Sequence, residues 1–302
     1  MSQNGREKKV FFLRLRHKPH SKRHLTDGRK YGMIRRTKTE IETEENIQMR
    51  ILALGDVVGT RTIEYLRERL WDVRKKHGVD FVIANGENAT EIRGISARDA
   101  KALLDTGVDL ITLGNHTYGM RDVYPFLEQS EQIIRPANYP PEAPGSPYVI
   151  ARVDGWRILC INVNGRAFMD AFASPFDTVD RILAREKGNY DLSVMDIHAE
   201  STSEKLAIAH YFDGRVDVIF GTHTHVPTAD ERILPKGSGY VTDLGMCGPV
   251  DGILGTAKEP VIEKFRTLMP VRFAVADGPI AAHGVLFELD GNRVTSVRRI
   301  RF

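Results

Sequence analysis

The chain has 302 residues, carries 43 Lys and Arg against 40 Asp and Glu, and contains two cysteines. This length suits one large α/β domain that buries roughly three-quarters of its unfolded surface. The sequence holds no run of about 18 apolar residues, as a membrane span would need, and its few cysteines favour a reducing cytoplasm over a disulfide-stabilised secreted protein.

Residues 1–48 differ from the remainder in charge. They hold 13 Lys or Arg and 6 Asp or Glu, a balance of +7, which leaves −4 on residues 49–302. The apolar run 10–13 is followed by Arg14 and Arg16, so it is too short for a secretory signal. We expect this leader to be a disordered tail, or to lie upstream of a functional start at Met49, rather than to be a basic arm that contacts RNA.

Five apolar runs are predicted as buried strands, and each stops at a polar side chain that can bind a metal ion. The runs cover residues 50–55, 80–84, 109–113, 191–197 and 216–220, and the polar residues after them are Asp56, then Glu87 and Asn88, then Asn115, then His198, then His223 and His225. Open α/β sheets hold their ligands at the carboxyl ends of the strands. Any one of these residues, taken singly, is more simply a cap for the next helix, but five together indicate a site.

The histidine pair is the most specific part of this pattern. His223 and His225 point the same way if the chain stays extended after its strand. Neutral imidazole is the commonest metal ligand. The alternative is a pair of loop histidines whose ring nitrogens are satisfied by ordinary hydrogen bonds.

Helical spacing and capping residues place three helices in the first two-thirds of the chain. One covers residues 62–77 and ends at Gly78, a second opens at Ser96 and ends before Gly107, and a third follows Ser201, with Glu204 completing a capping box. The proline-rich segment 136–147 is predicted to be a loop. After about residue 220 the pattern turns to strands, at 239–244, 271–276, 283–289 and 294–300.

In this order, Gly-Asp, Gly-Glu-Asn, Gly-Asn-His, a lone His and Gly-Thr-His-Thr-His resemble the calcineurin-like metallophosphoesterases. Within them the chain is similar to the YmdB-type subgroup, which hydrolyses cyclic nucleotides. The likeness includes residues 135–140, 164–166, 198–205, 228–235 and 242–246, and it covers residues 49–302. It implies an α/β fold of four layers, α/β/β/α, with two packed mixed sheets flanked by helices.

The resemblance also implies two metal ions per chain. The first set of ligands is Asp56, Glu87, Asn88 and His225, and the second is Glu87, Asn115, His198 and His223, so that Glu87 bridges. Carboxylate, amide and imidazole ligands suit Fe or Mn, with Zn as a further possibility. A metal-bound hydroxide then attacks the phosphorus.

One position departs from the wider family and one pair of residues departs from the subgroup, and a neighbouring histidine has a separate role. Val58 stands where most metallophosphoesterases have a ligating histidine, and Asn88 fills this gap in the subgroup. Tyr118-Gly119 replaces the usual Trp-Asp. By resemblance His116 is the general acid that protonates the leaving ribose oxygen. The alternative is that His116 only orients Asn115.

The predicted function is that of a cytoplasmic phosphodiesterase acting on small cyclic nucleotides, including the 2′,3′-cyclic kind. Arg166, Tyr118 and Thr224 are candidate substrate contacts, although Arg166 can equally be a surface ion-pair partner. A nuclease or phosphomonoesterase on the same fold, and a regulatory nucleotide-binding protein, are the alternatives. The expected partners are a small phosphodiester and further copies of the chain, with no membrane.

Overall fold

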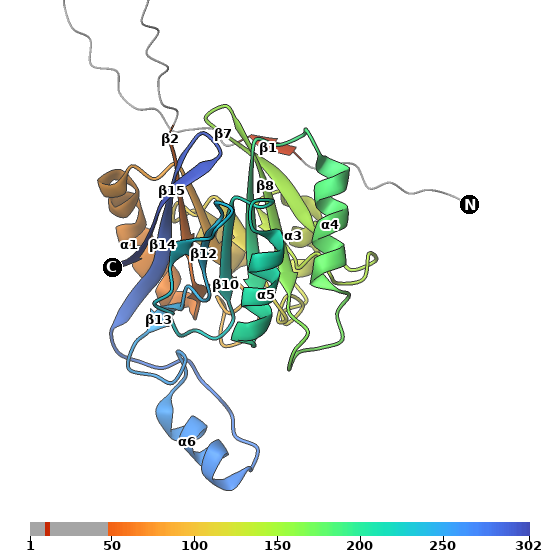
Figure 1. The fold of residues 1–302 in the computed structure, drawn as a ribbon. Helices are drawn as coiled ribbons and strands as arrows, with labels where there is room; N and C mark the ends of the chain where they lie inside the picture. The colour runs from red at the N-terminus through yellow and green to blue at the C-terminus, as the bar shows by residue number, and fades with distance from the viewer. Residues whose placement is uncertain (1–9, 13–47) are drawn as a thin grey trace, which may run out of the picture.

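The computed structural model describes residues 10–12 and 48–302 (Figure 1). The predictions for the rest of the leader, residues 1–9 and 13–47, lie outside the described residues. The first sheet contains, in spatial order, β1 (Val10–Phe12), β7 (Tyr148–Val153), β8 (Trp156–Asn164), β9 (Leu192–His198), β10 (Val218–Thr222), β12 (Gly239–Val241) and β11 (Arg232–Ile233). The second contains β3 (Asp56–Val57), β13 (Met246–Pro249), β14 (Ile280–Asp290), β2 (Gln48–Leu54), β4 (Phe81–Asn85), β5 (Leu110–Thr112) and β6 (Ile133–Ile134), with β15 (Arg293–Arg301) beside β14.

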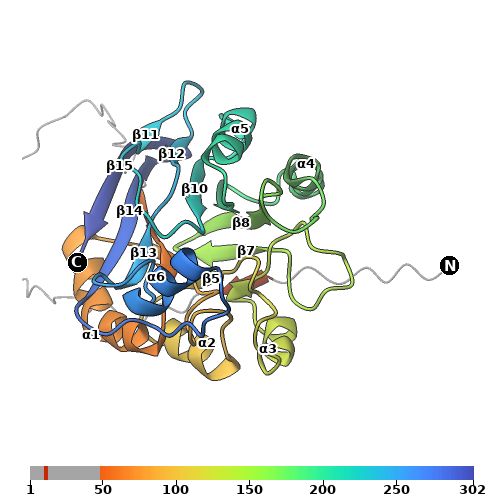
Figure 2. The same ribbon diagram turned by 90° about the horizontal axis from the view of Figure 1, so that it is seen from below.

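Helices lie on the outer faces of the sheets. The helices α1 (Thr60–His77), α2 (Ala97–Leu104) and α3 (Val123–Gln129) share one apolar cluster with the second sheet. The helices α4 (Pro175–Glu186) and α5 (Thr202–Phe212) share another with the first sheet. Figure 2 shows these two groups of helices on opposite sides of the strands. The remaining helix, α6 (Lys258–Thr267), projects from the body of the molecule (Figure 1).

A third apolar cluster lies between the two sheets. It contains residues of β2, β4 and β14 from the second sheet and of β7 to β10 from the first. The rings of Phe220 in β10 and Phe287 in β14 lie 6.4 Å apart between their centroids. The mixed α/β architecture is therefore two sheets packed face to face, as hydrophobic burial on both faces of each sheet requires.

Parallel pairing brings the carboxyl ends of the central strands together. β2, β4 and β5 run parallel in the second sheet, and β8, β9 and β10 run parallel in the first. Five of these six strands are those predicted to end at polar residues. Because the sheets pack face to face, their strand ends meet at one edge of the molecule.

Most predicted elements are confirmed. Helix α1 ends at Gly78, which adopts the left-handed conformation that ends helices (φ 63°). The segment 136–147 is a loop. The strand expected at 271–276 is wrong: Val271, Phe273 and Val275 alternate as in a strand, but the segment lacks a continuous pairing partner, and Val275 alone bridges to Thr256.

Of the two hydrogen bonds predicted for the capping box before α5, only one forms. The Ser201 side chain accepts from the Glu204 amide, as expected. The Glu204 carboxylate accepts from the backbone amides of Arg166 and Ala167 instead of returning to Ser201. Glu204 therefore ties the loop after β8 to the start of α5.

Part of the leader takes a place in a sheet. Val10–Phe12 forms β1, which pairs in parallel with Ile150 to Arg152 of β7 at the edge of the first sheet. Among the described residues, no helix has both the length and the apolar character needed to cross a membrane.

We predict that Phe287→Ala lowers the free energy of unfolding by about 3–5 kcal/mol, because it leaves a cavity between the sheets at a fully buried position. Urea denaturation of both proteins measures the difference. Phe168→Ala is the matched control, since that ring is 91% exposed and its loss should cost less than about 0.5 kcal/mol. Equal costs would contradict the two-sheet core.

Candidate metal centre

The predicted ligands come from both sheets and meet at one edge. From the second sheet come Asp56 in β3, Glu87 and Asn88 after β4, and Asn115 after β5. From the first come His198 at the end of β9 and the pair His223 and His225 after β10. The structure thus brings all seven predicted ligands to the junction of the two sheets.

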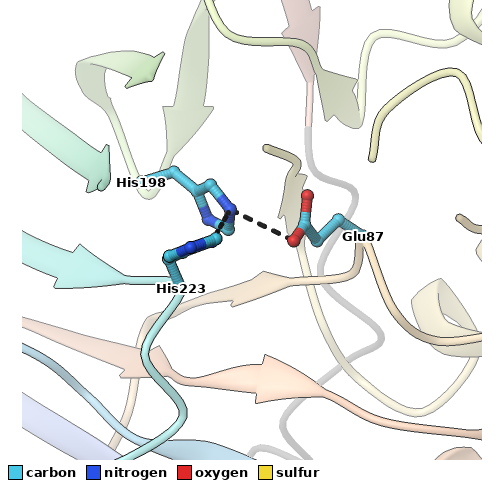
Figure 3. A group of neighbouring side chains, drawn as sticks. All are labelled: Glu87, His198 and His223. Carbon is cyan, nitrogen blue, oxygen red and sulfur yellow. Dashed lines mark hydrogen bonds and ion pairs between the residues drawn. The ribbon is translucent and has the colours of Figure 1, made fainter. Parts of the chain in front are cut away.

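The centre of this group is a cluster of one carboxylate and two imidazoles. Glu87, His198 and His223 each offer a ligand atom within 4.8 Å of the other two (Figure 3). His198 Nε2 lies 3.1 Å from Glu87 Oε1, 3.0 Å from His223 Nδ1 and 3.0 Å from Asn115 Oδ1. These four side chains are the predicted second ligand set.

The first ligand set lies on the other side of Glu87. The Asn88 amide nitrogen is 3.3 Å from Glu87 Oε1 and 3.3 Å from His225 Nε2. Asp56 Oδ1 is 3.7 Å from the same His225 nitrogen. Glu87 therefore contacts members of both sets, as a bridging ligand must.

Unsatisfied buried atoms show that the residues fit a cation. Asp56 Oδ1 and Asn88 Oδ1 are buried and accept no hydrogen bond. A buried acceptor without a donor is costly. A metal ion held by both residues would satisfy these oxygens, which are hard ligands suited to Mn, Fe or Zn.

The charge distribution supports the same fit. Burial raises the pKa of Asp56. Burial also opposes ionisation of Glu87 and His198, but their mutual contact outweighs it, holding the pKa of Glu87 below its usual range and that of His198 above it. Protonated His198 thus supplies positive charge among carboxylates, and a metal ion bound here would take over that charge.

The loop that carries His223 and His225 differs from the expected extended chain. Strand β10 ends at Thr222, and both histidines adopt left-handed backbone conformations, with φ of 96° and 64°. Such values are rare for residues with a Cβ and are held by surrounding contacts, often at functional sites. Here the His223 amide donates to Asp56 Oδ2 at 3.1 Å, so the turned backbone is tied to another predicted ligand.

A buried ion pair also holds this loop. Lys205 Nζ lies 2.6 Å from Asp243 Oδ2, and both side chains are fully buried. The same carboxylate accepts from the Thr224 amide at 3.2 Å, between the two histidines. Because removing one partner of such a pair leaves a buried charge, Lys205 fixes the loop through Asp243.

Each of the three histidines is oriented by a contact to the ring nitrogen that faces away from the cluster. His198 Nδ1 lies 2.9 Å from the Thr222 hydroxyl, which donates to Asp196 Oδ1 at 2.8 Å. Glu200 Oε2 lies 3.0 Å from His223 Nε2. His225 Nδ1 lies 3.1 Å from the Leu254 carbonyl oxygen. Each contact leaves the other ring nitrogen facing the centre, as in metal sites where a carboxylate or carbonyl fixes the tautomer.

Gly114 provides the space between the two sheets. A Cβ at this position would collide with His198 Nε2 and with Glu87 Oε2. The glycine before Asn115 therefore permits the close approach on which the cluster depends.

His116 lies beside the cluster. Its amide donates to Glu87 Oε2 at 2.9 Å, and its partly exposed ring is next to the Asn115 amide. Burial lowers the pKa of His116. The position suits a proton donor at the open side of the site.

The three candidate substrate residues are placed differently. Arg166 is exposed, and its guanidinium makes no ion pair with a described residue. The Tyr118 hydroxyl donates to the Pro144 carbonyl at 2.7 Å, and its ring packs edge-on against Tyr139 at 5.2 Å. Thr224 is partly exposed between the histidines. Arg166 and Thr224 thus have side chains open to solvent, whereas the Tyr118 hydroxyl is already bonded.

Sequence reasoning did not identify the supporting residues. Glu200 and Lys205 lie within the family-like segment 198–205, and Thr222 lies within Gly-Thr-His-Thr-His. The resemblance therefore included these residues, but it assigned them no role. Asp196 sits two positions before His198 on the same strand face, which was a usable signal.

A family model described as YmdB-like protein matches residues 52–300. The chain belongs to the YmdB-like family. A relative from Bacillus subtilis (strain 168), named 2′,3′-cyclic-nucleotide 2′-phosphodiesterase, is 41% identical over 250 residues, which cover 83% of this chain and 95% of the relative.

Two solved structures are similar to this chain over most of its length. The crystal structure of a hypothetical protein from Thermus thermophilus has a TM-score of 0.80 at 41% identity, covering 84% of this chain and 99% of that one. A novel phosphatase from Mycoplasma pneumoniae has a TM-score of 0.80 at 34% identity, covering 84% and 93%.

We predict that the protein binds about two metal ions per chain and that His223→Ala loses most of one. Elemental analysis after purification with Mn measures the content. His210→Ala, on the exposed side of α5, is the control and should keep the full complement. A metal-free wild-type protein in every preparation would refute the centre.

We further predict that Thr222→Val weakens metal binding by about 10–100-fold, because it removes the hydroxyl between His198 and Asp196. Calorimetric titration with Mn measures the affinity. Thr112→Val is the matched control: its hydroxyl also bonds Asp196, at 2.5 Å, without contacting His198. The same loss in both variants would show that Asp196 burial, rather than His198 orientation, is responsible.

Proposed function

We propose that this YmdB-like chain is a dinuclear-metal phosphodiesterase that hydrolyses small cyclic nucleotides, including the 2′,3′-cyclic kind. The observation that carries the proposal is the position of Glu87 between two groups of ligands from different sheets. The relatives named as a phosphodiesterase and a phosphatase support hydrolysis of phosphoesters as the reaction class.

In this proposal Asp56, Glu87, Asn88 and His225 hold one metal ion, and Glu87, Asn115, His198 and His223 hold the other. Two such ions, when bound, lower the pKa of water and neutralise charge on the phosphoryl group. Oxygen and imidazole ligands favour Fe or Mn, with Zn as an alternative, and the buried Cys160 and Cys247 are not among them.

The residues of the chain supply orientation and a proton. The His116 ring lies on the partly exposed side of the cluster, where it can face the leaving oxygen of a bound diester. Its backbone amide donates to Glu87, the proposed bridging ligand, so this bond would hold the proton donor beside the residues that bind the metal ions. The negative charge of a bound diester favours the protonated ring against the effect of burial.

Substrate contacts are proposed for three side chains, of which Arg166 is exposed and the other two are partly exposed. The planar guanidinium of Arg166 can bind phosphate in a bidentate manner, and Glu204 holds the backbone of its loop. The Thr224 hydroxyl lies between His223 and His225. Tyr118 is proposed to contribute through its ring, since its hydroxyl bonds Pro144.

The finer description of the fold belongs to the same proposal. The three apolar clusters, one between the sheets and one under each group of helices, support the four-layer α/β/β/α sandwich of the metallophosphoesterases. Such a fold hosts several phosphoester hydrolases, so the site must decide the substrate.

The test is turnover of Mn-loaded protein on 2′,3′-cyclic AMP, bis-p-nitrophenyl phosphate and p-nitrophenyl phosphate. We predict preference for the cyclic substrate, and we predict that His116→Ala keeps both metals but loses about 10²–10⁴-fold of turnover on it. The loss should shrink for p-nitrophenyl substrates, whose leaving group needs no proton.

Other outcomes separate the alternatives. Preference for p-nitrophenyl phosphate would indicate a phosphomonoesterase, and binding of 2′,3′-cyclic AMP without turnover would indicate a regulatory protein. Equal losses in His116→Ala on good and poor leaving groups would assign His116 to orienting Asn115. His210→Ala again serves as the control variant.

A further inference from the structure

An exposed arginine lies beside the proposed proton donor. Arg93 belongs to the loop 89–96, which connects the predicted ligand Asn88 to α2. Its guanidinium makes no hydrogen bond or ion pair with a described residue. Most arginines are exposed and simply solvated, so the position of this one decides whether it has a role.

Backbone packing brings Arg93 next to the turn that begins at His116. A Cβ on Gly94, whose φ is 88°, would lie 2.8 Å from Met120 Cγ and 3.1 Å from the Gly119 carbonyl carbon. A Cβ on Gly119 would likewise lie 3.1 Å from Gly94 Cα, and the Gly119 amide donates to the His116 carbonyl at 2.9 Å. The two glycines thus permit a close approach that holds the loop of Arg93 beside His116.

The electrostatics of His116 agree with this placement. Burial lowers the pKa of His116, and the Glu87 carboxylate opposes this effect. The Arg93 guanidinium lowers the same pKa, by more than His198 or His225 does. Electrostatic effects weaken with distance, so the guanidinium lies close to the ring. The open side of the site therefore carries a cation without an anionic partner among the described residues.

A second unpaired arginine lies on the neighbouring turn. Arg121 directly follows Met120, which packs against Gly94, and its exposed guanidinium also makes no hydrogen bond or ion pair with a described residue. Neither Glu91 nor Asp122, the acidic residues of the two turns, pairs with these arginines. The planar fork of a guanidinium matches phosphate oxygens, so this edge of the site suits a phosphate group.

We propose that Arg93 binds a phosphate group at the 5′ position of the nucleotide whose cyclic phosphate is cleaved, with Arg121 beside it. This inference rests on the phosphodiesterase activity proposed above. In that reaction His116 protonates the leaving oxygen of the ribose, so the sugar lies at His116 and the scissile phosphorus lies at the metal ligands. A cation on the sugar side faces the 5′ substituent. The 5′-phosphate is bound there and is not cleaved.

Arg166 lies on a different side of the site. It follows β8 in the first sheet, where the Gly165 amide donates to the His198 carbonyl at 2.9 Å, whereas Arg93 follows β4 in the second sheet. Arg166 therefore suits the phosphate that is cleaved, and Arg93 suits a second one. A substrate with both groups is a 2′,3′-cyclic nucleotide that also carries a 5′-phosphate, either free or as the 3′ end of an RNA chain.

The test compares kcat/KM of Mn-loaded, full-length protein on three substrates. They are 2′,3′-cyclic AMP, adenosine 5′-phosphate 2′,3′-cyclic phosphate, and the dinucleotide ApA with a 2′,3′-cyclic phosphate at its 3′ end. We expect a 5′-phosphate to raise kcat/KM by roughly tenfold or more. The preference, measured as a ratio between substrates, should fall to near one in Arg93→Ala. Arg93→Lys should keep part of it, because Lys keeps the charge but not the planar fork.

Arg69→Ala is the matched control, since it removes an exposed arginine of α1 that pairs with Glu68, and it should keep the wild-type ratio. Preference for the dinucleotide assigns the phosphate to the end of an RNA chain, and preference for the mononucleotide alone assigns it to a free 5′-phosphate; both support the proposal. A wild type without the preference, or a preference that survives Arg93→Ala, overturns it. A loss by the same factor on every substrate would show that Arg93 acts on the scissile phosphate or on His116 instead.

Failure of the proposed function is visible separately, as the absence of turnover on all three cyclic substrates. Calorimetric titration with adenosine 3′,5′-bisphosphate and with 3′-AMP then tests Arg93 without turnover. Tighter binding of the bisphosphate that is lost in Arg93→Ala but kept in Arg69→Ala supports the 5′-phosphate site. Equal affinities for the two nucleotides, or binding of neither, overturns it.

Discussion

The buried contact between Glu87 and His198 is the constraint on which the site depends, because it joins the two sheets. Glu87 follows β4 in the second sheet and His198 ends β9 in the first. A carboxylate and an imidazole so deeply buried are costly to hold without compensation. The face-to-face packing of two apolar sheet surfaces offsets this cost and fixes the distance between the two groups.

The polar contacts around the centre then follow from the need to keep each ligand in one orientation. Thr222 and Asp196 fix His198, Glu200 contacts His223, and the Leu254 carbonyl contacts His225. These partners come from two strands, β9 and β10, and from two loops, one after β9 and one after β13, so the ligand geometry depends on distant parts of the fold. The Lys205–Asp243 pair extends the same support beneath the left-handed turn at His223.

Residue order alone predicted which side chains gather at the junction of the two sheets. The apolar runs ending at Asp56, Glu87, Asn115, His198 and His223 predicted the strands and their common edge, because parallel strands present their carboxyl ends together. The same periodicity identified α1, and the capping residues identified the starts of α2 and α5. These signals are local, so one sequence is enough to detect them.

Only the tertiary structure decided how those side chains meet. The left-handed backbone at His223 and His225 depends on contacts with Asp56 and Asp243, which are distant in sequence. Thr222, Asp196 and Lys205 were not singled out because their roles arise only where two sheets and a helix converge. The segment 271–276 alternates like a strand, yet it forms none because pairing requires a neighbouring strand, and no local pattern reveals whether one is present.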